Sequence, residues 1–203
     1  LFPFGTLDEI SAQYKANIIT HTRVASVDAV AKTVSTTDGQ TTSYDKILVT
    51  TGATAFVPGS FASLKGAFCM RTVDDAVKLH DAIAARDYKD AVIVGASMVG
   101  IKVAELLHKR GCHVTLADMA PHIFALAAYP EVSEMIEARL EKMGIDMVFG
   151  KAIAGAVEHT DEAGNITSTT VQLADGSAIE TELLVLNIGT RAATGILDPQ
   201  QIH

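Results

Sequence analysis

Two apolar runs with different spacing stand together near the middle of the chain. Val92–Val94 is a continuous apolar run that stops at Gly95, and apolar residues then recur at helical spacing over 98–110. This change of period predicts a strand, a tight turn and a helix. A β-rich run follows at His113–Ala117 and ends at Asp118. The pattern therefore predicts two parallel strands joined by a crossover helix.

Similar patterns along the rest of the chain predict an α/β fold. Helices are expected from Thr6 to about Lys15, from the Arg71–Asp75 cap to about Ala85 and over 131–143; strands are expected over 22–28, 33–37, 47–49, 145–149 and 183–188, with a hairpin over 151–173. We expect a Rossmann-like parallel sheet on residues 91–94, 114–117, 145–149 and 183–188, flanked by helices on its faces and crossed on one side by a three-stranded antiparallel β-meander.

The pattern over 33–52 returns over 170–189 without a gap. Asp38-Gly39 aligns with Asp175-Gly176, Ile47–Val49 with Leu184–Leu186, and Gly52 with Gly189, so the two copies stand 137 residues apart. Two copies of one β-meander are the interpretation, and a chance similarity between two hairpins is the alternative, because Asp-Gly turns are common. If the copies are related, the first should also follow a nucleotide-binding unit, whose turn would lie about forty residues before Leu1.

The turn between the central strand and helix has the spacing of a dinucleotide-binding loop. Gly95 allows the sharp turn, and Gly100 lets the helix lie close to the sheet. The backbone N–H groups between them then form an anion-binding site at the helix N-terminus. Ser97 replaces the middle glycine of that fingerprint. The candidate phosphate-binding residues are Gly95, Ala96, Ser97, Met98, Val99 and Gly100. A purely structural strand–helix–strand unit is the alternative.

An acidic residue ends the second strand of this unit. Asp118 lies 18 residues after Gly100, close to the spacing at which such a carboxylate holds the ribose hydroxyls of a dinucleotide. The carboxylate would repel a 2′-phosphate, and its neighbour is Met119 rather than an arginine. Asp118 and Met119 are therefore candidate ribose-site residues, and the pattern predicts NAD(H) in preference to NADP.

Charge and composition exclude several classes of partner. The 203 residues carry a formal net charge of −8 and no basic block, which argues against nucleic acid and against an anionic membrane surface. No apolar run reaches the roughly 18 residues that span a bilayer, and no signal pattern is present, so a cytoplasmic protein is expected.

Other reactive side chains are given structural interpretations. Cys69 and Cys112 form no C-x-x-C pair, and Cys112 is expected to be a buried thiol. His108, His113 and His122 lie in one region of the chain, but His108 and His113 are five residues apart across a helix end and a turn and do not share a helical face, so no metal site is predicted. Asp74 and Asp75 are interpreted as charges at a helix N-terminus, not as a catalytic pair, and no hydrolase nucleophile is identified.

Two further segments resemble a known family. Tyr44–Ala53 ends in Thr50-Thr51-Gly52-Ala53 and is similar to the segment near the flavin in pyridine nucleotide-disulfide oxidoreductases, and Ile188–Arg191 resembles its counterpart in the second domain. The nearest group comprises the nitrite reductases, rubredoxin reductases, NADH oxidases and coenzyme A disulfide reductases. Thr50 stands where alanine is usual, and Ala192-Ala193 stand where proline and asparagine are usual.

The resemblance implies a division of the chain and a role for each part. Residues 1–69 would be a partial, β-rich segment of an FAD-binding domain, 70–186 the NADH-binding domain and 187–203 a return towards the FAD domain. NADH would pass a hydride to the flavin, with Thr51, Gly52, Ile188 and Gly189 among the cofactor-binding residues. Because the FAD phosphate loop would lie upstream, this chain alone is expected to hold FAD poorly and to be inactive. Lys102 stands where many relatives have glutamate, and a solvated helix lysine is its alternative interpretation.

Two other functions remain open at this point. A stand-alone nucleotide-binding or sensory module would need no flavin site, and a methyltransferase could use the same loop, although the repeat has no place in it. The electron acceptor and any catalytic residue are undetermined by these residues. Exposed edge strands in the β-rich segment could also support a homodimer.

Overall fold

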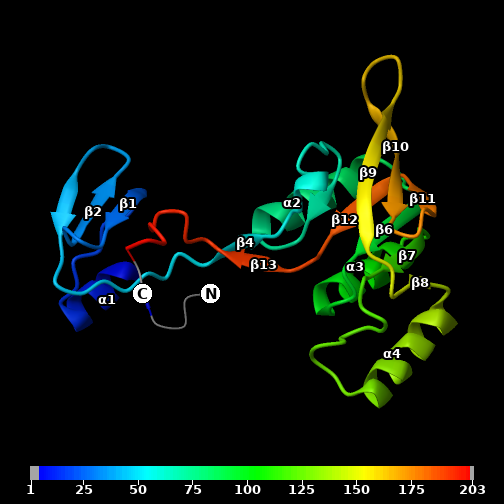
Figure 1. Ribbon diagram of the computed structural model, residues 1–203, viewed down its shortest axis with the longest axis horizontal. Helices are drawn as coiled ribbons and strands as arrows, with labels where there is room; N and C mark the ends of the chain where they lie inside the picture. The colour runs from blue at the N-terminus through cyan, green and yellow to red at the C-terminus, as the bar shows by residue number, and fades with distance from the viewer. Residues whose placement is uncertain (1–4, 202–203) are drawn as a thin grey trace. The chain divides into compact units, whose positions relative to one another are not determined.

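The chain forms two compact units in a computed structural model that describes residues 5–201. The first unit contains residues 1–52 and 192–203, and the second contains residues 53–191. The chain therefore passes between the units twice (Figure 1). The two units are defined by which residues pack together. The predicted boundaries at 69/70 and 186/187 are those of the family's domains, and they stay a prediction.

The second unit is built on a five-stranded parallel sheet. Its strands are β5 (Phe68–Cys69), β12 (Leu183–Leu186), β6 (Asp90–Val94), β7 (His113–Ala117) and β8 (Asp146–Val148), in that spatial order. All four pairings are parallel. The four predicted strands are confirmed: β6 and β7 each begin one residue earlier than predicted, and β8 and β12 are shorter than predicted. The two-residue strand β5 was not predicted, because a pair of residues carries no periodicity.

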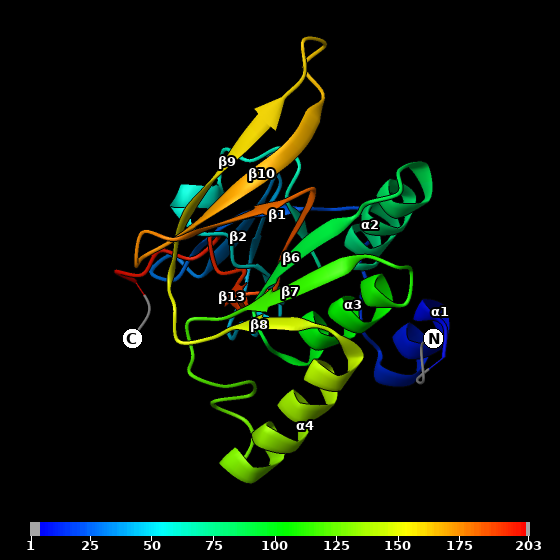
Figure 2. The ribbon, with the colours of Figure 1, turned by 90° about the vertical axis from the view of Figure 1, so that its right-hand side faces the viewer.

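All three helices of this unit pack on one face of the sheet. The helices are α2 (Val73–Ala85), α3 (Met98–His108) and α4 (Pro130–Met143). Leu79, Leu107 and Leu140, one from each helix, join a single buried cluster with Ile93 of β6. Figure 2 shows α3 and α4 on one side of β6–β8 and the β9–β10 hairpin on the other. The predicted flanking helices therefore lie together on one face, and the predicted meander covers the other.

An antiparallel sheet covers that opposite face. It contains β9 (Ile153–Thr160), β10 (Ile166–Leu173) and β11 (Ala178–Thr181), ordered β11-β10-β9. Val171 of β10 and Phe61 of a short 3-10 helix (Gly59–Phe61) lie in one buried cluster with Val92, Val94 and Leu184. Since side chains alternate across a strand, Val92 and Val94 face this sheet while Ile93 faces the helices.

Local sequence signals set the helix ends. The Thr72 hydroxyl accepts a hydrogen bond from the Asp75 N–H at 3.2 Å, and the Asp75 carboxylate accepts from the Thr72 N–H at 2.8 Å, which forms a capping box for α2. This confirms Asp75 as a helix-terminal charge. Helix α4 begins with Pro130 at its first turn and ends at Gly144, whose φ of 83° is left-handed. Helix α3 ends at His108, two residues before the prediction.

The first unit contains the other copy of the meander. Helix α1 (Leu7–Tyr14) precedes β1 (Val24–Asp28), β2 (Thr33–Thr36) and β3 (Thr41–Ser43), which form an antiparallel sheet in the order β1-β2-β3. Strand β4 (Ala53–Ala55) belongs to the second unit and pairs with β13 (Thr190–Ala192), which crosses the unit boundary at residues 191 and 192. Across residues 5–201, no helix is long and apolar enough to cross a membrane.

The two copies share the hydrogen bonds of their turns. In the first, the Thr36 N–H donates to Gln40 O at 2.9 Å and the Gly39 N–H to Thr36 O at 3.0 Å. In the second, the Leu173 N–H donates to Ser177 O at 2.8 Å and the Gly176 N–H to Leu173 O at 3.1 Å. Each partner in the second turn lies 137 residues after its counterpart. The two Asp-Gly turns therefore share one geometry, which is common in hairpins, and a common origin of the two copies stays a prediction.

The repeat breaks down at Ile47–Val49. Leu184–Leu186 is a buried strand paired on both sides, by β5 and β6. Ile47–Val49 was expected to be the equivalent strand, but it is not a strand, and Leu48 is 86% exposed. The prediction was wrong because a strand needs a hydrogen-bonded neighbour, and none of the strands in the described residues pairs with this run.

Candidate functional site

The chain makes a tight turn at the carboxyl end of β6. Gly95 has a φ of +107°, which disfavours any residue with a side chain, and its N–H donates to Ala117 O of β7 at 2.8 Å. A Cβ at Gly95 would lie 2.7 Å from the carbonyl carbon of Asn187 and overlap its oxygen. The first glycine of the predicted loop is therefore required both by conformation and by space.

Gly100 brings helix α3 against the same turn. A Cβ there would overlap the carbonyl oxygen of Gly95 and lie 3.1 Å from its carbonyl carbon. Gly100 is buried, and its helix starts only two residues earlier. The sequence assigned this glycine to close helix packing, and the structure confirms that role.

The first turn of α3 leaves backbone donors free for an anion. The N-cap residue Ser97 is extended, with φ −94° and ψ 179°, and its hydroxyl makes no capping hydrogen bond within the described chain. The Ile101 N–H donates to Ser97 O at 2.9 Å, so the N–H groups of Met98, Val99 and Gly100 have no partner of their own in the helix. Ser97, Met98 and Val99 are exposed. Free donors and the helix dipole together favour a phosphate here.

Asp118 is bonded to the loop itself. Its Oδ2 accepts a hydrogen bond from the Ala96 N–H at 2.7 Å, and its Oδ1 accepts from the Ala120 N–H at 2.9 Å. The Asp118 backbone N–H donates to Val148 O at 3.0 Å, which fixes the residue between β7 and β8. Sequence spacing placed Asp118 beside the loop but did not predict these bonds. The carboxylate thus joins the phosphate turn to the end of the second strand.

Two hollows meet at Ser97 along the carboxyl edge of the sheet. One, of about 220 Å³, is lined by Ala96, Asp118, Ala120, His122 and Phe124 among others. The other, of about 180 Å³, is lined by Met70, Arg71, Val99, Asn187 and Gly189 among others. The strand order changes direction between β12 and β6, and ligands of open parallel sheets bind outside the carboxyl ends at such a point.

The other predicted site residues lie in different surroundings. Met119 is 73% exposed beside Asp118, and Ile188 packs against the buried cluster under the meander. Thr51 and Gly52 belong to the first unit, where the Thr51 hydroxyl donates to Ala193 O at 2.7 Å and the Ala193 N–H donates to Gly52 O at 2.9 Å. Their part in cofactor binding stays a prediction.

Lys102 is a solvated helix lysine in this structure. Its Nζ donates to Glu105 at 2.8 Å, and Lys109 contacts the same carboxylate at 2.5 Å. Hydrogen bonds from these two ammonium groups lower the pKa of Glu105 to about 2. The Lys102 side chain is 62% exposed. The alternative interpretation of Lys102 therefore fits the observed contacts.

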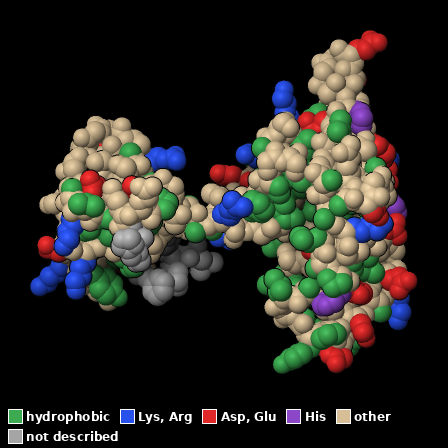
Figure 3. All heavy atoms as spheres, viewed as in Figure 1, with side chains coloured by type: hydrophobic (Ala, Val, Ile, Leu, Met, Phe, Trp, Pro, Cys, Tyr) green, Lys and Arg blue, Asp and Glu red, His purple; other side chains and the backbone are tan. Residues whose placement is uncertain are grey.

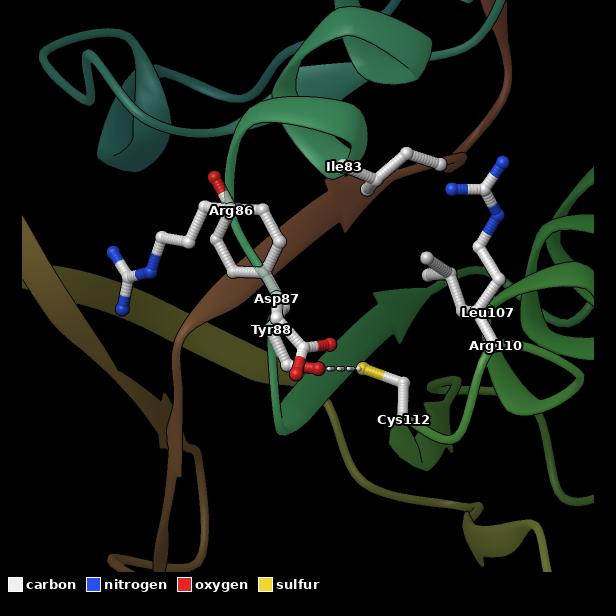
Figure 4. Close-up of a pocket in the computed structure, with 7 residues that line it drawn as sticks. All are labelled: Ile83, Arg86, Asp87, Tyr88, Leu107, Arg110 and Cys112. Atoms are coloured by element: carbon white, nitrogen blue, oxygen red, sulfur yellow. Dashed lines mark hydrogen bonds between the residues drawn. The ribbon is translucent and has the colours of Figure 1, made fainter.

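Another hollow lies at the opposite, amino end of the strands. It is lined by Arg86, Asp87, Tyr88, Arg110 and Cys112 among others (Figure 4). The Cys112 Sγ donates to Tyr88 O at 3.2 Å, and burial, with nearby carboxylates, raises the pKa of Cys112 to about 11. Such a thiol stays protonated and unreactive near neutral pH. Cys112 is buried as predicted, and this hollow contains no nucleophile.

The remaining candidates do not converge on a metal. His113 lies 2.9 Å from Asp146 and 3.3 Å from Asp90, while His122 lines the hollow beside Asp118. Over residues 5–201, no three His, Cys, Asp or Glu side chains are grouped to bind a metal ion.

Figure 3 shows hydrophobic side chains gathered on the second unit near α2 and α3, where Met70, Leu79, Ile83, Val103 and Leu106 line an apolar hollow.

These features define an α/β protein whose parallel sheet carries a glycine turn, a free helix N-terminus and a carboxylate at one edge. The sequence profile of the pyridine nucleotide-disulphide oxidoreductases matches residues 3–203. The chain therefore belongs to the pyridine nucleotide-disulphide oxidoreductase family, as the resemblance of its motifs predicted.

Individual relatives agree with this assignment. The chain is 30% identical to monodehydroascorbate reductase 2, peroxisomal, of Oryza sativa subsp. japonica, over 97% of this chain and 42% of that protein. It is 31% identical to the nitric oxide reductase FlRd-NAD(+) reductase of Shigella dysenteriae serotype 1, over 94% of this chain and 48% of that protein. The structure of the water-forming NADH oxidase from Lactobacillus brevis, solved bound to NADH, superposes on this chain with a TM-score of 0.78 at 24% identity. The match covers 93% of this chain and 41% of that protein.

The chain spans less than half the length of these relatives. The relatives are oxidoreductases by name, and the L. brevis likeness establishes the fold of this chain. Because the rice relative is named for the peroxisome, a cytoplasmic location stays a prediction, as does a homodimer.

Proposed function

We propose that this chain is the NADH-binding part of an FAD-dependent oxidoreductase that delivers electrons to an unidentified acceptor. The observation that carries the proposal is the loop at Gly95–Gly100. Gly95 and Gly100 pack directly against backbone atoms, and the first turn of α3 has free N–H groups. The Asp118 carboxylate is hydrogen-bonded to the Ala96 N–H. These groups lie at the carboxyl edge of the sheet, where parallel sheets bind ligands. Family membership supports a nicotinamide dinucleotide site in this chain. We assign residues 70–186 to the NADH-binding domain.

Each residue of the loop has a role in this proposal. The N–H groups of Ser97, Met98 and Val99 hold the pyrophosphate, and Asp118 accepts hydrogen bonds from the adenosine ribose while keeping its bonds to the loop. Gly189 lines the hollow for the nicotinamide. Bound NADH supplies the hydride that a flavin of the longer protein accepts. The residues of this chain hold and orient the dinucleotide.

The proposal predicts that the chain binds NADH at least tenfold more tightly than NADPH. Asp118 faces the ribose side of the hollow, and a 2′-phosphate there would meet a carboxylate with no arginine in the residues that line the hollow. Calorimetric titration of both nucleotides measures the difference. Equal affinity would contradict the role of Asp118, and binding of neither would overturn the proposed function. An absorbance scan of the purified chain tests the expectation that it retains little or no FAD.

Replacing Ser97 with glycine is expected to strengthen NADH binding a few-fold. The hydroxyl makes no capping bond, so its loss should change the free energy of unfolding by only a few tenths of a kcal/mol. The smaller residue lets the pyrophosphate approach the backbone more closely. Titration of NADH into both proteins checks this, with Gly59→Ala as a control outside the loop. Weaker binding by Ser97→Gly would show that the hydroxyl itself contacts the ligand.

A further inference from the structure

A surface of exposed apolar side chains lies where the loop after β7 meets the start of α4 (Figure 1). Met98, Tyr129 and Met135 are 76%, 80% and 74% exposed, and Leu126 and Val132 are exposed with them. These five residues are called the methionine surface below. Single exposed apolar side chains are ordinary on soluble proteins, but a contiguous group of them marks an interaction site.

An apolar hollow of about 380 Å³ joins these residues. Met98 of α3 and Val132 of α4 both line it. Tyr129 directly precedes α4, Met135 lies one turn after Val132, and Leu126 belongs to the loop that forms the rest of the wall. The other lining residues are Ser97, Phe124, Ala127, Ala128 and Ile136. Since all of these except Ser97 are apolar, the hollow suits an apolar anchor side chain of a partner.

Two polar side chains of α4 hold the loop of this surface in place. The Ser133 hydroxyl donates a hydrogen bond to Ile123 O at 2.7 Å, and the Ile123 N–H donates to Glu137 Oε1 at 2.8 Å. Ser133 and Ile123 are both buried. A loop fixed in this way has little conformational freedom to lose when a partner binds, so the methionine surface is preorganised for binding.

The charged residues beside the methionine surface are acidic. Glu131 and Glu134 are exposed on the first two turns of α4, and residues 111–138 contain no lysine or arginine. Among residues 5–201, neither carboxylate has an ion-pair partner. Lys102 is paired with Glu105, and Arg139 lies about two turns after Glu131. Figure 3 shows hydrophobic and acidic side chains together at this lower end of the second unit.

The sign of this charge decides which occupant fits. A second copy of the chain, whose formal net charge is −8, would place carboxylates against carboxylates at this surface. A partner with positive charges beside an apolar face instead gains from both parts of the surface, because its apolar side chains enter the hollow while its cations meet Glu131 and Glu134.

We propose that the methionine surface binds a basic amphipathic helix of another protein. Apolar side chains that recur at helical spacing on one face of that helix pack on Met98 and Met135, and one of them enters the hollow. Lysine or arginine residues beside that face pair with Glu131 and Glu134. Methionine suits such a contact, because its flexible and polarisable side chain adapts to different apolar partners. The proposal goes beyond dinucleotide binding and does not depend on it.

Calorimetric titration of the 203-residue chain with a synthetic amphipathic helix of leucine and lysine, about 18 residues long, tests the proposal. We expect a dissociation constant of about 10 μM or below at low salt, and weaker binding as salt screens the carboxylates. A peptide with the same leucines and glutamate in place of lysine should not bind. A peptide that keeps the lysines and has alanine in place of leucine should bind at least tenfold more weakly.

Surface variants locate the binding. The double variant Leu126→Ser/Met135→Gln should weaken the leucine–lysine peptide about tenfold, since it removes exposed apolar contacts. Glu131→Gln/Glu134→Gln should weaken it several-fold and reduce the salt dependence. Glu141→Gln is the matched control, because it removes one exposed carboxylate near the other end of α4 and should change nothing. All of these side chains are exposed, so unchanged thermal midpoints should show that each variant folds.

Three results would overturn the proposal. The first is that the leucine–lysine peptide does not bind the original chain, or binds no better than the glutamate peptide. The second is binding that neither surface variant weakens. The third is a dimer of the original chain in sedimentation that Leu126→Ser/Met135→Gln dissociates, because the surface would then be a contact between copies of this chain.

Discussion

Replacing Gly100 with alanine is expected to destabilise the second unit by about 3 kcal/mol and to abolish measurable NADH binding. Helix propensity alone predicts the opposite, since alanine is more favourable than glycine inside a helix by about 1 kcal/mol. The packing effect is larger, because the added methyl would overlap the Gly95 carbonyl oxygen, which belongs to the backbone and cannot rotate away. Helix α3 would have to move off β6, and the free N–H groups would move with it.

Thermal unfolding and calorimetric titration measure both effects of Gly100→Ala. A loss of about 3 kcal/mol corresponds to a fall of about 10 °C in the unfolding midpoint for a unit of this size. Gly59→Ala is the matched control, since a Cβ at Gly59 meets nothing within 4 Å. An alanine variant with unchanged midpoint and unchanged NADH affinity would show that α3 does not need this close approach.

Replacing Asp118 with alanine should weaken NADH binding about a hundredfold and remove the preference over NADPH. Two effects combine: the ribose loses its acceptor, and the Ala96 and Ala120 N–H groups lose the carboxylate that positions the turn. Hydrogen bonds to charged groups contribute about 1.5–3 kcal/mol each, and 1.4 kcal/mol is a factor of ten in affinity. NADPH should lose less, because the variant also removes repulsion of its 2′-phosphate.

Paired titrations of NADH and NADPH separate these contributions. Asp118→Asn keeps the size and one acceptor oxygen, so it should retain more NADH affinity than Asp118→Ala. Glu134→Ala removes one exposed negative charge from α4 and should change neither affinity. If Asp118→Ala keeps the original preference for NADH, the discrimination lies elsewhere in the hollow.

The local part of the site could be predicted from the sequence. Gly95 and Gly100 were recognised because a strand that stops at a glycine and restarts as a helix needs a positive φ and a close approach, and the structure shows both. The Asp-Gly turns of the repeat were predicted for the same reason, since four or five neighbouring residues fix their hydrogen bonds. These features depend on residues that are adjacent in the chain.

The features that were missed depend on residues far apart. Phe68–Cys69 is a strand only because β12 lies beside it, and Ile47–Val49 is not a strand because it has no such neighbour among the described strands. The bond from Ala96 to Asp118 joins residues 22 positions apart, and the spacing predicted proximity without the donor. The unpartnered amide of Asn187 has no sequence signal beyond one polar residue after an apolar run.

By itself, the sequence determined the α/β class, the glycine turn, the Asp-Gly turns of the two antiparallel sheets and the family. Each of these follows from short-range periodicity, from backbone conformations that glycine alone adopts easily, or from motifs of a few residues. The tertiary structure decided that all three helices of the second unit share one face of the sheet, that Asp118 accepts a hydrogen bond from the loop, and that the side-chain amide of Asn187 is buried. Burial and hydrogen bonding between distant segments depend on the whole fold, and no local pattern of residues specifies them.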